Sequence, residues 1–343
     1  MNDLGPILRR YQTRGRMANG RFLLVTTVKD EGPHILEWVA WHRLCGFDRI
    51  MVFQNGSTDL TQRSLRVMHH HGMIEYVPNE TGRSSPQIRA YARTSRSQAF
   101  RQAEWCIAID ADEFFVSHVG SGTVGEFAER IGTADAALLN WRNYGSSGIA
   151  EMGDGLTTAR FTHTHPASQV ARTLTGFKTL FRTSAFDRIG IHNARYPRKD
   201  DIRSVNGSGL EDGAFERLNW RCKDPGCMAL ARINHYPIRD ASSFLLKTLR
   251  GRGHQDHFAD WVSYWRRFER NSVEDRAIAD QEVRLRAEMH RMDEISNGRL
   301  TLIRRKSHLI WRQTFASAMD IPENRAFHER IVSMIDTPPV TQP

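Results

Sequence analysis

The chain has 343 residues, a formal net charge of +9 and four cysteines. Its length suits one large domain or two ordinary ones, and its basic charge favours anionic partners such as phosphorylated substrates or an anionic membrane face. No run approaches about 18 consecutive apolar residues, which excludes a transmembrane helix. Residues 1–20 lack the apolar core of a signal peptide. With too few cysteines for a disulfide scaffold, we expect a cytoplasmic protein.

Apolar segments alternate with helical patterns through the first third of the chain. Strands are predicted at residues 21–28, 49–53, 73–77 and 105–109, and helices at 34–45, 60–71 and 86–103. Strand–helix alternation with short polar turns predicts a parallel sheet layered by helices. Residues 21–118 are therefore predicted to form the nucleotide-binding half of an α/β domain, after an N-terminal extension over 1–20.

The rest of the chain is less regular. Strand-like segments at 136–140, 178–182 and 189–192 surround a Gly- and Ser-rich loop, and we expect an acceptor half over 119–240. Residues 241–335 are helical and basic in pattern, with amphipathic stretches at 244–249 and 300–311, and residues 336–343 are predicted to be disordered. A cluster of three basic residues at 304–306 lies beside apolar residues and Trp311. That pattern is typical of a membrane-surface helix, and equally of a helix docked on its own domain.

The most informative stretch is residues 105–115, where an apolar strand runs into Asp110, Asp112 and Glu113. Ligands bind at the carboxyl ends of strands in open α/β sheets. Carboxylates clustered there repel one another unless a cation, a basic group or shared protons compensate, and Mg²⁺ or Mn²⁺ is the simplest compensation. The spacing of the two aspartates puts them on one side of an extended segment. A solvated acidic turn after an ordinary strand is the alternative interpretation.

Several blocks occur in a recognisable order: TVKDEGPHILEW at 27–38, NGSTD at 55–59 and DADEF at 110–114. Together they resemble the family 2-like glycosyltransferases, most closely the branch related to family 92 (DUF23-type). YGSSG at 144–148, and NHY at 234–236 ahead of FLLK at 244–247 and RG at 250–251, agree with the resemblance. Two residues depart from the family pattern, since Asp30 stands where Asn is usual and Gly56 where Asp is frequent.

The resemblance implies a GT-A-like fold, that is, an α/β, Rossmann-like, mostly parallel sheet flanked by helices, here with a helical basic C-terminal region. It implies a metal-dependent, inverting glycosyltransferase with a nucleoside-diphosphate-sugar donor, UDP-sugar favoured, and Mn²⁺ or Mg²⁺. We expect a glycan or lipid-linked acceptor, a role in polysaccharide biosynthesis, and a cytoplasmic location that leaves open peripheral contact with an anionic inner membrane face.

The same resemblance assigns roles to particular residues. Asp112 and Asp110 would hold the metal, with Asp110 also closer to the ribose or sugar. His235 is the preferred further ligand and His192 the alternative. Residues of two turns are expected to bind the nucleotide: Lys29, Asp30, Glu31, Asn55 and Asp59. The general base is expected at Asp212 or Glu211, with Glu113 as the alternative.

Other classes remain open from the sequence. A metal-dependent phosphatase or nucleotidyltransferase would use the same carboxylates, and a non-catalytic sugar-nucleotide sensor fits the two departures. A non-catalytic nucleic-acid-binding protein would fit the charge alone, but the basic residues are spread and no known nucleic-acid-binding motif occurs, so we expect no specific nucleic acid partner.

Overall fold

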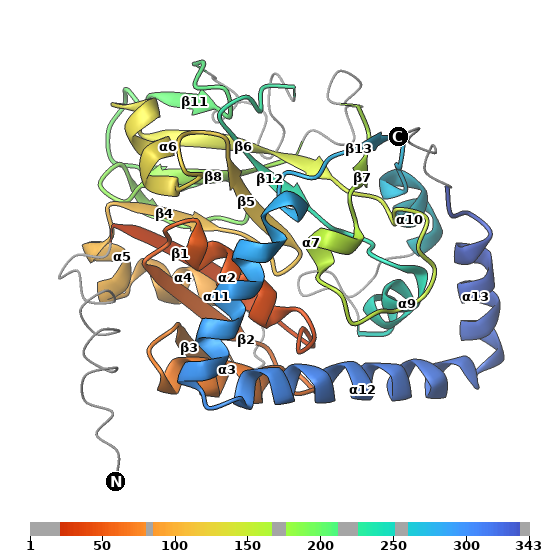
Figure 1. Ribbon diagram of the computed structural model, residues 1–343. Helices are drawn as coiled ribbons and strands as arrows, with labels where there is room; N and C mark the ends of the chain where they lie inside the picture. The colour runs from red at the N-terminus through yellow and green to blue at the C-terminus, as the bar shows by residue number, and fades with distance from the viewer. Residues whose placement is uncertain (1–20, 80–84, 167–175, 212–225, 251–259, 337–343) are drawn as a thin grey trace, which may run out of the picture.

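The structure is a computed structural model that describes residues 21–79, 85–166, 176–211, 226–250 and 260–336. A nine-stranded sheet with the order β3-β2-β1-β4-β8-β6-β12-β5, in which β11 also pairs with β6, runs through the molecule (Figure 1). Its strands are β1 (Phe22–Val28), β2 (Arg49–Gln54), β3 (Glu75–Pro78), β4 (Trp105–Ala108), β5 (Glu113–Ser117), β6 (Ala136–Asn143), β8 (Phe177–Arg182), β11 (Ser204–Asn206) and β12 (Ala231–His235). Two small antiparallel pairs join β9 (Phe186–Arg188) to β10 (Arg195–Pro197), and β7 (His163–Thr164) to β13 (Val273–Glu274).

Helices cover both faces of this sheet. The helices of the described residues are α2 (Ile35–Leu44), α3 (Thr61–His70), α4 (Pro86–Ser95), α5 (Gln98–Gln102), α6 (Val124–Ile131), α7 (Thr157–Arg160), α9 (Ala241–Arg250), α10 (Trp261–Phe268), α11 (Glu282–Ile295), α12 (Arg299–Met319) and α13 (Pro322–Val332), with a 3₁₀ turn η3 at Ala279–Gln281. One apolar cluster packs α2, α3, α6 and α11 against the sheet, and a second packs α4 and α5 against it. A third joins α9, α10 and α13.

The first half of the sheet forms as the sequence predicts. β1 pairs in parallel with β2 and β4, and β2 pairs in parallel with β3. Residues 22–26 of β1 are all buried, as expected for a strand with helices on both faces. Because these strands share one direction, the turns that follow β1, β2 and β4 meet at a single edge of the sheet, which we call the carboxyl edge.

Two predicted elements are wrong. The helix expected over residues 86–103 is two helices, because Ser97 adopts an extended backbone and its side chain accepts a hydrogen bond from the Phe100 N–H, which starts α5. The strand expected at 189–192 is absent from those residues. The nearby strand, β9, ends at Arg188, and the Ile189 N–H donates to the Ser95 side chain. Ile189 is buried in the second apolar cluster, and this burial explains why an apolar residue stands at this position.

The second half makes the sheet mixed. β8 runs antiparallel to both β4 and β6, and β5 runs antiparallel to β12, whereas β12 and β11 pair in parallel with β6. The predicted fold class is confirmed as an α/β arrangement with a mostly parallel sheet, flanking helices and a helical C-terminal region. The predicted extension over 1–20 and residues 337–343 of the predicted tail lie outside the described residues. Within the described chain, no helix combines the length and apolar character needed to cross a bilayer.

Candidate active site

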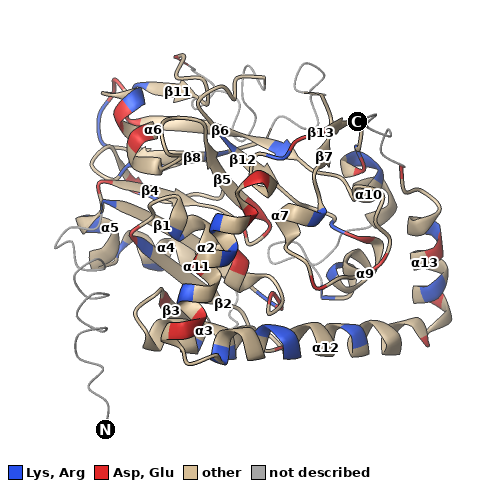
Figure 2. Ribbon diagram, viewed as in Figure 1, with Lys and Arg blue, Asp and Glu red and all other residues tan. Residues whose placement is uncertain are grey.

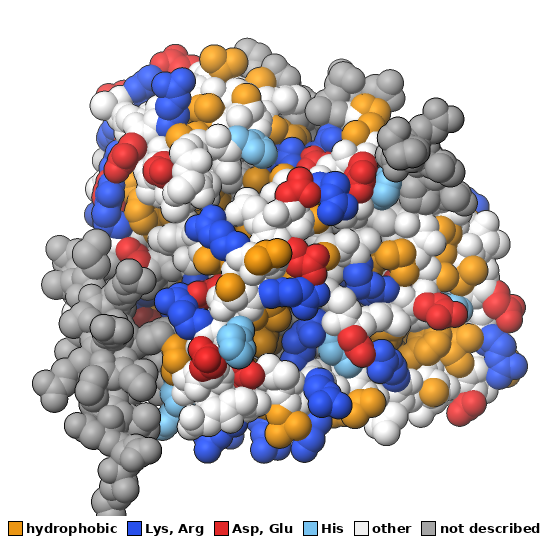
Figure 3. Space-filling model, viewed as in Figure 1, with side chains coloured by type: hydrophobic (Ala, Val, Ile, Leu, Met, Phe, Trp, Pro, Cys, Tyr) orange, Lys and Arg blue, Asp and Glu red, His pale blue; other side chains and the backbone are white. Residues whose placement is uncertain are grey.

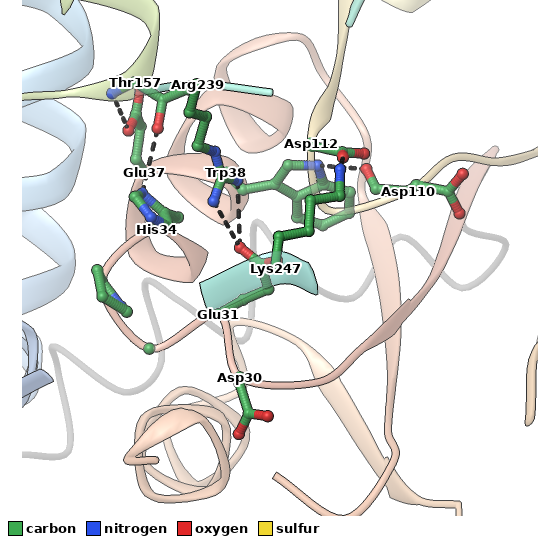
Figure 4. A network of polar contacts seen from close by, with 12 residues as sticks. Asp30, Glu31, His34, Glu37, Trp38, Asp110, Asp112, Thr157, Arg239 and Lys247 are labelled. Atoms are coloured by element: carbon green, nitrogen blue, oxygen red, sulfur yellow. Dashed lines mark hydrogen bonds and ion pairs between the residues drawn. The ribbon is translucent and has the colours of Figure 1, made fainter. Parts of the chain in front are cut away.

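Helix α2 holds the turn that carries Asp110 and Asp112. The Trp38 indole N–H donates to the backbone oxygens of Asp110, at 3.2 Å, and Glu113, at 2.8 Å. The Trp41 indole N–H donates to the Phe115 backbone oxygen at 2.7 Å. All of these groups are buried except the Asp110 side chain, so the backbone between β4 and β5 has little freedom (Figure 4). The two aspartates are thus presented at the carboxyl edge by contacts far apart in sequence.

The first aspartate is paired with a buried lysine from β8. Lys178 Nζ lies 3.0 Å from Asp110 Oδ2 and 3.5 Å from Glu113 Oε2, and neither the Lys178 nor the Glu113 side chain has exposed surface. The Gln87 amide donates to the other Asp110 oxygen at 2.8 Å. Burial raises the pKa of Glu113 well above its usual range, and the Lys178 ammonium opposes that shift. Both Asp110 oxygens therefore have protein partners.

The second aspartate has a lysine on one oxygen and a histidine facing the other. Lys247 Nζ, from α9, lies 2.9 Å from Asp112 Oδ2. His235 Nε2, at the end of β12, lies 3.9 Å from Asp112 Oδ1. Burial alone would raise the pKa of Asp112, but the Lys247 ammonium holds it below its usual range.

The tautomer of His235 follows from its other neighbour. Its Nδ1 lies 2.7 Å from the Asn143 side-chain oxygen, which can only accept, so Nδ1 carries the proton and the Nε2 lone pair is directed to the Asp112 side. Burial lowers the pKa of His235 to about 4. The Trp141 ring packs against His235 with centroids 4.7 Å apart and against His192 at 5.5 Å. His235, rather than His192, is therefore the histidine next to Asp112.

These groups can be compared with the needs of a divalent cation. Among the described residues no three His, Cys, Asp or Glu side chains gather around one point, because Asp110 is engaged by Lys178 and Gln87. Asp112 and His235 together fit an ion such as Mn²⁺, because hard divalent ions are commonly held by one or two protein ligands and completed by phosphate oxygens and water. The predicted part of Asp110 as a metal ligand finds no support in this arrangement.

The two turns expected to bind the nucleotide do lie side by side at the carboxyl edge, but their polar groups bond to the protein. Asp30 accepts from the Thr58 N–H at 2.6 Å, and Asp59 accepts from the N–H groups of Gly32 and Thr61, both at 2.8 Å. The Asn55 oxygen accepts from Asn79 at 2.6 Å, and Lys29 Nζ donates to the Arg250 backbone oxygen at 3.3 Å. In Figure 4, Asp30 points away from Lys247 and Asp112.

Glu31 is buried and forms ion pairs with two arginines. Its oxygens lie 3.1 Å from Arg239 Nη1 and 2.8 Å from Arg250 Nη2. Glu31, one of the residues expected to bind the nucleotide, thus holds two basic side chains in place. The sequence did not single out these two arginines, nor the lysines that pair with the aspartates, Lys178 and Lys247. Lys247 and Arg250 nevertheless lie in FLLK and RG, two of the blocks that carry the resemblance.

Two of the three candidate bases, Glu113 and Glu211, belong to the described residues and lie in different environments. Glu113 is fully buried beneath Lys178, which speaks against its reaching an acceptor hydroxyl. Glu211 is 77% exposed, pairs with Arg203, and bridges to β11 at the end of β6 remote from His235. The structure does not bring Glu211 together with Asp112. Asp212 lies outside the described residues.

A cleft of about 250 Å³, counting space open to solvent, lies beside Asp112. Its charged lining consists of Asp112 and three basic side chains, Arg239, Lys247 and Arg250, and Trp311 of α12 closes one wall. In Figure 4, Arg239 extends toward Glu31, and Lys247 extends toward Asp112. The cleft is thus a cationic space next to Asp112 and the histidine that faces it, and it suits a phosphorylated ligand.

Several solved structures are similar to part of this chain. Among solved structures, S. aureus TarS 1–349 is similar with 14% identity and a TM-score of 0.31, and the match covers 48% of each chain. The same protein in complex with UDP matches with 15% identity over 48% of this chain and 47% of that one, with a TM-score of 0.31. A putative glucose-1-phosphate thymidylyltransferase from Bacillus anthracis matches with 8% identity over 48% of this chain and 72% of that one, with a TM-score of 0.27. The chain thus spans about half the length of the TarS structures, and no curated protein sequence matches it.

The sequence pattern of glycosyltransferase family 92 matches residues 28–206, from the end of β1 to the end of β11. This range is more than half of the chain and contains both turns of the carboxyl edge, Asp110, Asp112 and Lys178. The family assignment and the cationic cleft at the end of a mostly parallel sheet point the same way: the chain belongs to glycosyltransferase family 92.

Proposed function

We propose that this glycosyltransferase moves a sugar, with inversion at the anomeric carbon, from a nucleoside-diphosphate sugar to a hydroxyl of a glycan or lipid-linked acceptor. The UDP-sugars are the favoured donors, and polysaccharide biosynthesis is the proposed setting. The observation that carries the proposal is Asp112, which faces His235 Nε2 at 3.9 Å on the wall of a cleft with three basic side chains. A leaving diphosphate needs such an environment, because its negative charge grows as the bond to the sugar breaks.

Asp112 and His235 are the proposed ligands of Mn²⁺ or Mg²⁺. When bound, the ion would supply Lewis-acid stabilisation of the leaving diphosphate. The chain's own contribution is to present one carboxylate oxygen and one unprotonated ring nitrogen on the same side of the turn, with Asn143 fixing the imidazole through Nδ1. Asp110, held by Lys178, is proposed to lie toward the ribose or sugar.

Isothermal titration tests the donor site. UDP, GDP and CDP are titrated with and without Mn²⁺ into the native protein, into Asp112→Asn and into Asp320→Asn, a matched substitution at the exposed end of α12. We expect Mn²⁺ to tighten binding of one nucleotide, and Asp112→Asn alone to lose that tightening. If Mn²⁺ changes no nucleotide's affinity, or if Asp112→Asn keeps the full effect, the proposed metal site is wrong.

The general base is proposed at Asp212. Replacement of Asp212 by Asn should lower kcat with the nucleotide affinity unchanged, because the base acts on the acceptor and not on the donor. Glu211→Gln is the neighbouring control, since Glu211 is paired with Arg203 on the surface. Equal activity of Asp212→Asn and the native enzyme would exclude this assignment.

We propose that α12 touches an anionic membrane surface with its outer face. The helix contains no Asp or Glu; its outward side carries Arg305 and Lys306 beside Leu302 and Leu309, which are 52% and 55% exposed. Figure 2 shows the blue basic positions along α12, and Figure 3 shows Lys and Arg side chains gathered with apolar ones along that lower edge. The inner side of the helix, with Ile303 and Trp311, is buried on its own domain, so one helix can serve both contacts.

Vesicle sedimentation tests this contact. The protein should sediment with vesicles that contain phosphatidylglycerol and stay in solution with pure phosphatidylcholine, and added salt should release it. A double substitution, Arg305→Glu with Lys306→Glu, should abolish sedimentation without a loss of nucleotide binding. Equal sedimentation of the double variant and the native protein would rule out α12 as the contact.

A further inference from the structure

The end of helix α9 places two cations on one wall of the cleft. Lys247 and Arg250 are three residues apart, so their side chains share a side of the helix. Two other residues of α9, Phe244 and Leu245, are buried. Arg250 Nη1 donates to the backbone oxygens of Lys29 and Asp30, at 2.7 and 2.8 Å. These contacts fix α9 against the turn that follows β1.

The cations of this wall retain hydrogen-bonding capacity. A lysine ammonium has three donors; Lys247 directs two of them to Asp112 Oδ2 at 2.9 Å and to the Pro237 backbone oxygen at 2.6 Å. The Nε donor of Arg239, a residue only 6% exposed, has no hydrogen-bond partner among the described residues. A buried guanidinium donor without an acceptor is costly, and Arg239 is one of the residues that line the cleft.

The positions of Lys247 and of the proposed metal ligands are compatible. Lys247 contacts Oδ2 of Asp112, whereas His235 faces Oδ1 of the same carboxylate. The ammonium and a divalent ion would therefore approach Asp112 from different sides. Behind them, Glu31 balances part of the charge of Arg239 and Arg250, which leaves the cleft lining with three basic groups against one acidic group.

We infer that Lys247, Arg250 and Arg239 bind the diphosphate of the donor directly, so that the nucleotide binds even in the absence of a metal ion. This inference rests on the proposed function for the identity of the ligand, but its charge chemistry can be tested apart from it. In this arrangement Glu31 is a positioning residue, because it orients the two arginines without facing the cleft lining.

The experiment is isothermal titration in EDTA with three probes: UDP, uridine and inorganic pyrophosphate. Lys247→Met is compared with the charge-preserving Lys247→Arg and with Lys306→Met, the same substitution on the exposed face of α12. We expect Lys247→Met to weaken UDP and pyrophosphate by roughly tenfold or more, because a charge-assisted hydrogen bond is lost, and to leave uridine unchanged. Lys247→Arg should stay within a few-fold of the native protein, and Lys306→Met should match it.

Several results would overturn the inference. The native protein could fail to bind both UDP and pyrophosphate in EDTA. Lys247→Met could bind both ligands with unchanged affinity, or it could lose as much affinity for uridine as for UDP. Thermal melting checks that each variant is folded, and Arg250→Gln replaces Lys247→Met in the same titration if the latter does not fold. Pyrophosphate binding that depends on Lys247 with no nucleotide bound would refute the proposed donor alone. Asp112-dependent nucleotide binding in Mn²⁺ without any effect of Lys247 would refute this inference alone.

Discussion

Protonation of the buried His42 side chain makes the stability of the protein depend on pH. Its Nδ1 lies 2.8 Å from the Trp38 backbone oxygen, and its Nε2 accepts from the Phe115 N–H at 3.2 Å, so both ring nitrogens are satisfied in the neutral form. The residue is fully buried. Protonation would place an N–H against the Phe115 N–H. Burial lowers the pKa of His42 from 6.5 to about 3, and the bond to Trp38 offsets only part of that shift.

The sign and size of the effect follow from this pKa. Below the unfolded-state pKa of about 6.5, the unfolded chain binds a proton that the native state refuses until about pH 3. The contribution of neutral His42 is therefore complete above about pH 6.5 and is lost as the pH falls, by roughly 1.4 kcal/mol per pH unit. Between pH 7 and pH 5, the free energy of unfolding should fall by about 2 kcal/mol on account of this residue.

The assay is denaturant unfolding at pH 7, 6 and 5 for the native protein and His42→Gln. Glutamine stays neutral, so the variant lacks this proton linkage, and the stability gap between the two proteins should narrow by about 2 kcal/mol from pH 7 to pH 5. Other buried histidines titrate in both proteins and cancel in the difference. His290→Gln, at a side chain that is 72% exposed, should run parallel to the native protein. A gap for His42→Gln that is constant with pH would refute the reasoning.

Two further substitutions probe the supports of the site. Gly176→Ala should displace the Trp141 ring, which packs on His235, because a methyl group at residue 176 would overlap that ring. Mn²⁺-dependent nucleotide binding should therefore weaken in titration. Gly125→Ala, whose nearest new contact is Phe22 at 3.7 Å, is the control, and equal affinities for the two variants would contradict the prediction. Trp38→Phe should lower the free energy of unfolding by about 1–3 kcal/mol in denaturant unfolding, because the Asp110 and Glu113 carbonyls lose a buried donor. The loss should be larger than for Trp41→Phe, which removes a donor from the Phe115 carbonyl only. The reverse order would show that these bonds do not hold the turn.

Local patterns were sufficient to predict the first half of the fold. β1, β2 and β4 are short apolar runs closed by polar turns, and both properties are set by neighbouring residues. The same locality explains the two errors. A single residue, Ser97, ends a helical pattern by capping the next helix. The apolar residues at 189 and 191 pack in or against the second cluster without strand pairing.

The sequence by itself determined which residues reach the carboxyl edge, since Asp110, Asp112, Asp59 and Glu31 each follow a strand of one parallel set. Only the tertiary structure decided what each of them does there. Lys178 and Lys247 reach the aspartates from 68 and 135 residues away, and Arg239 reaches Glu31 from 208. Such ion pairs depend on how β8 and α9 pack, and no periodicity in the chain encodes that packing. The partners then decide the role of each carboxylate: protein groups engage both oxygens of Asp110 and of Glu31, whereas one oxygen of Asp112 binds Lys247 and the other faces His235.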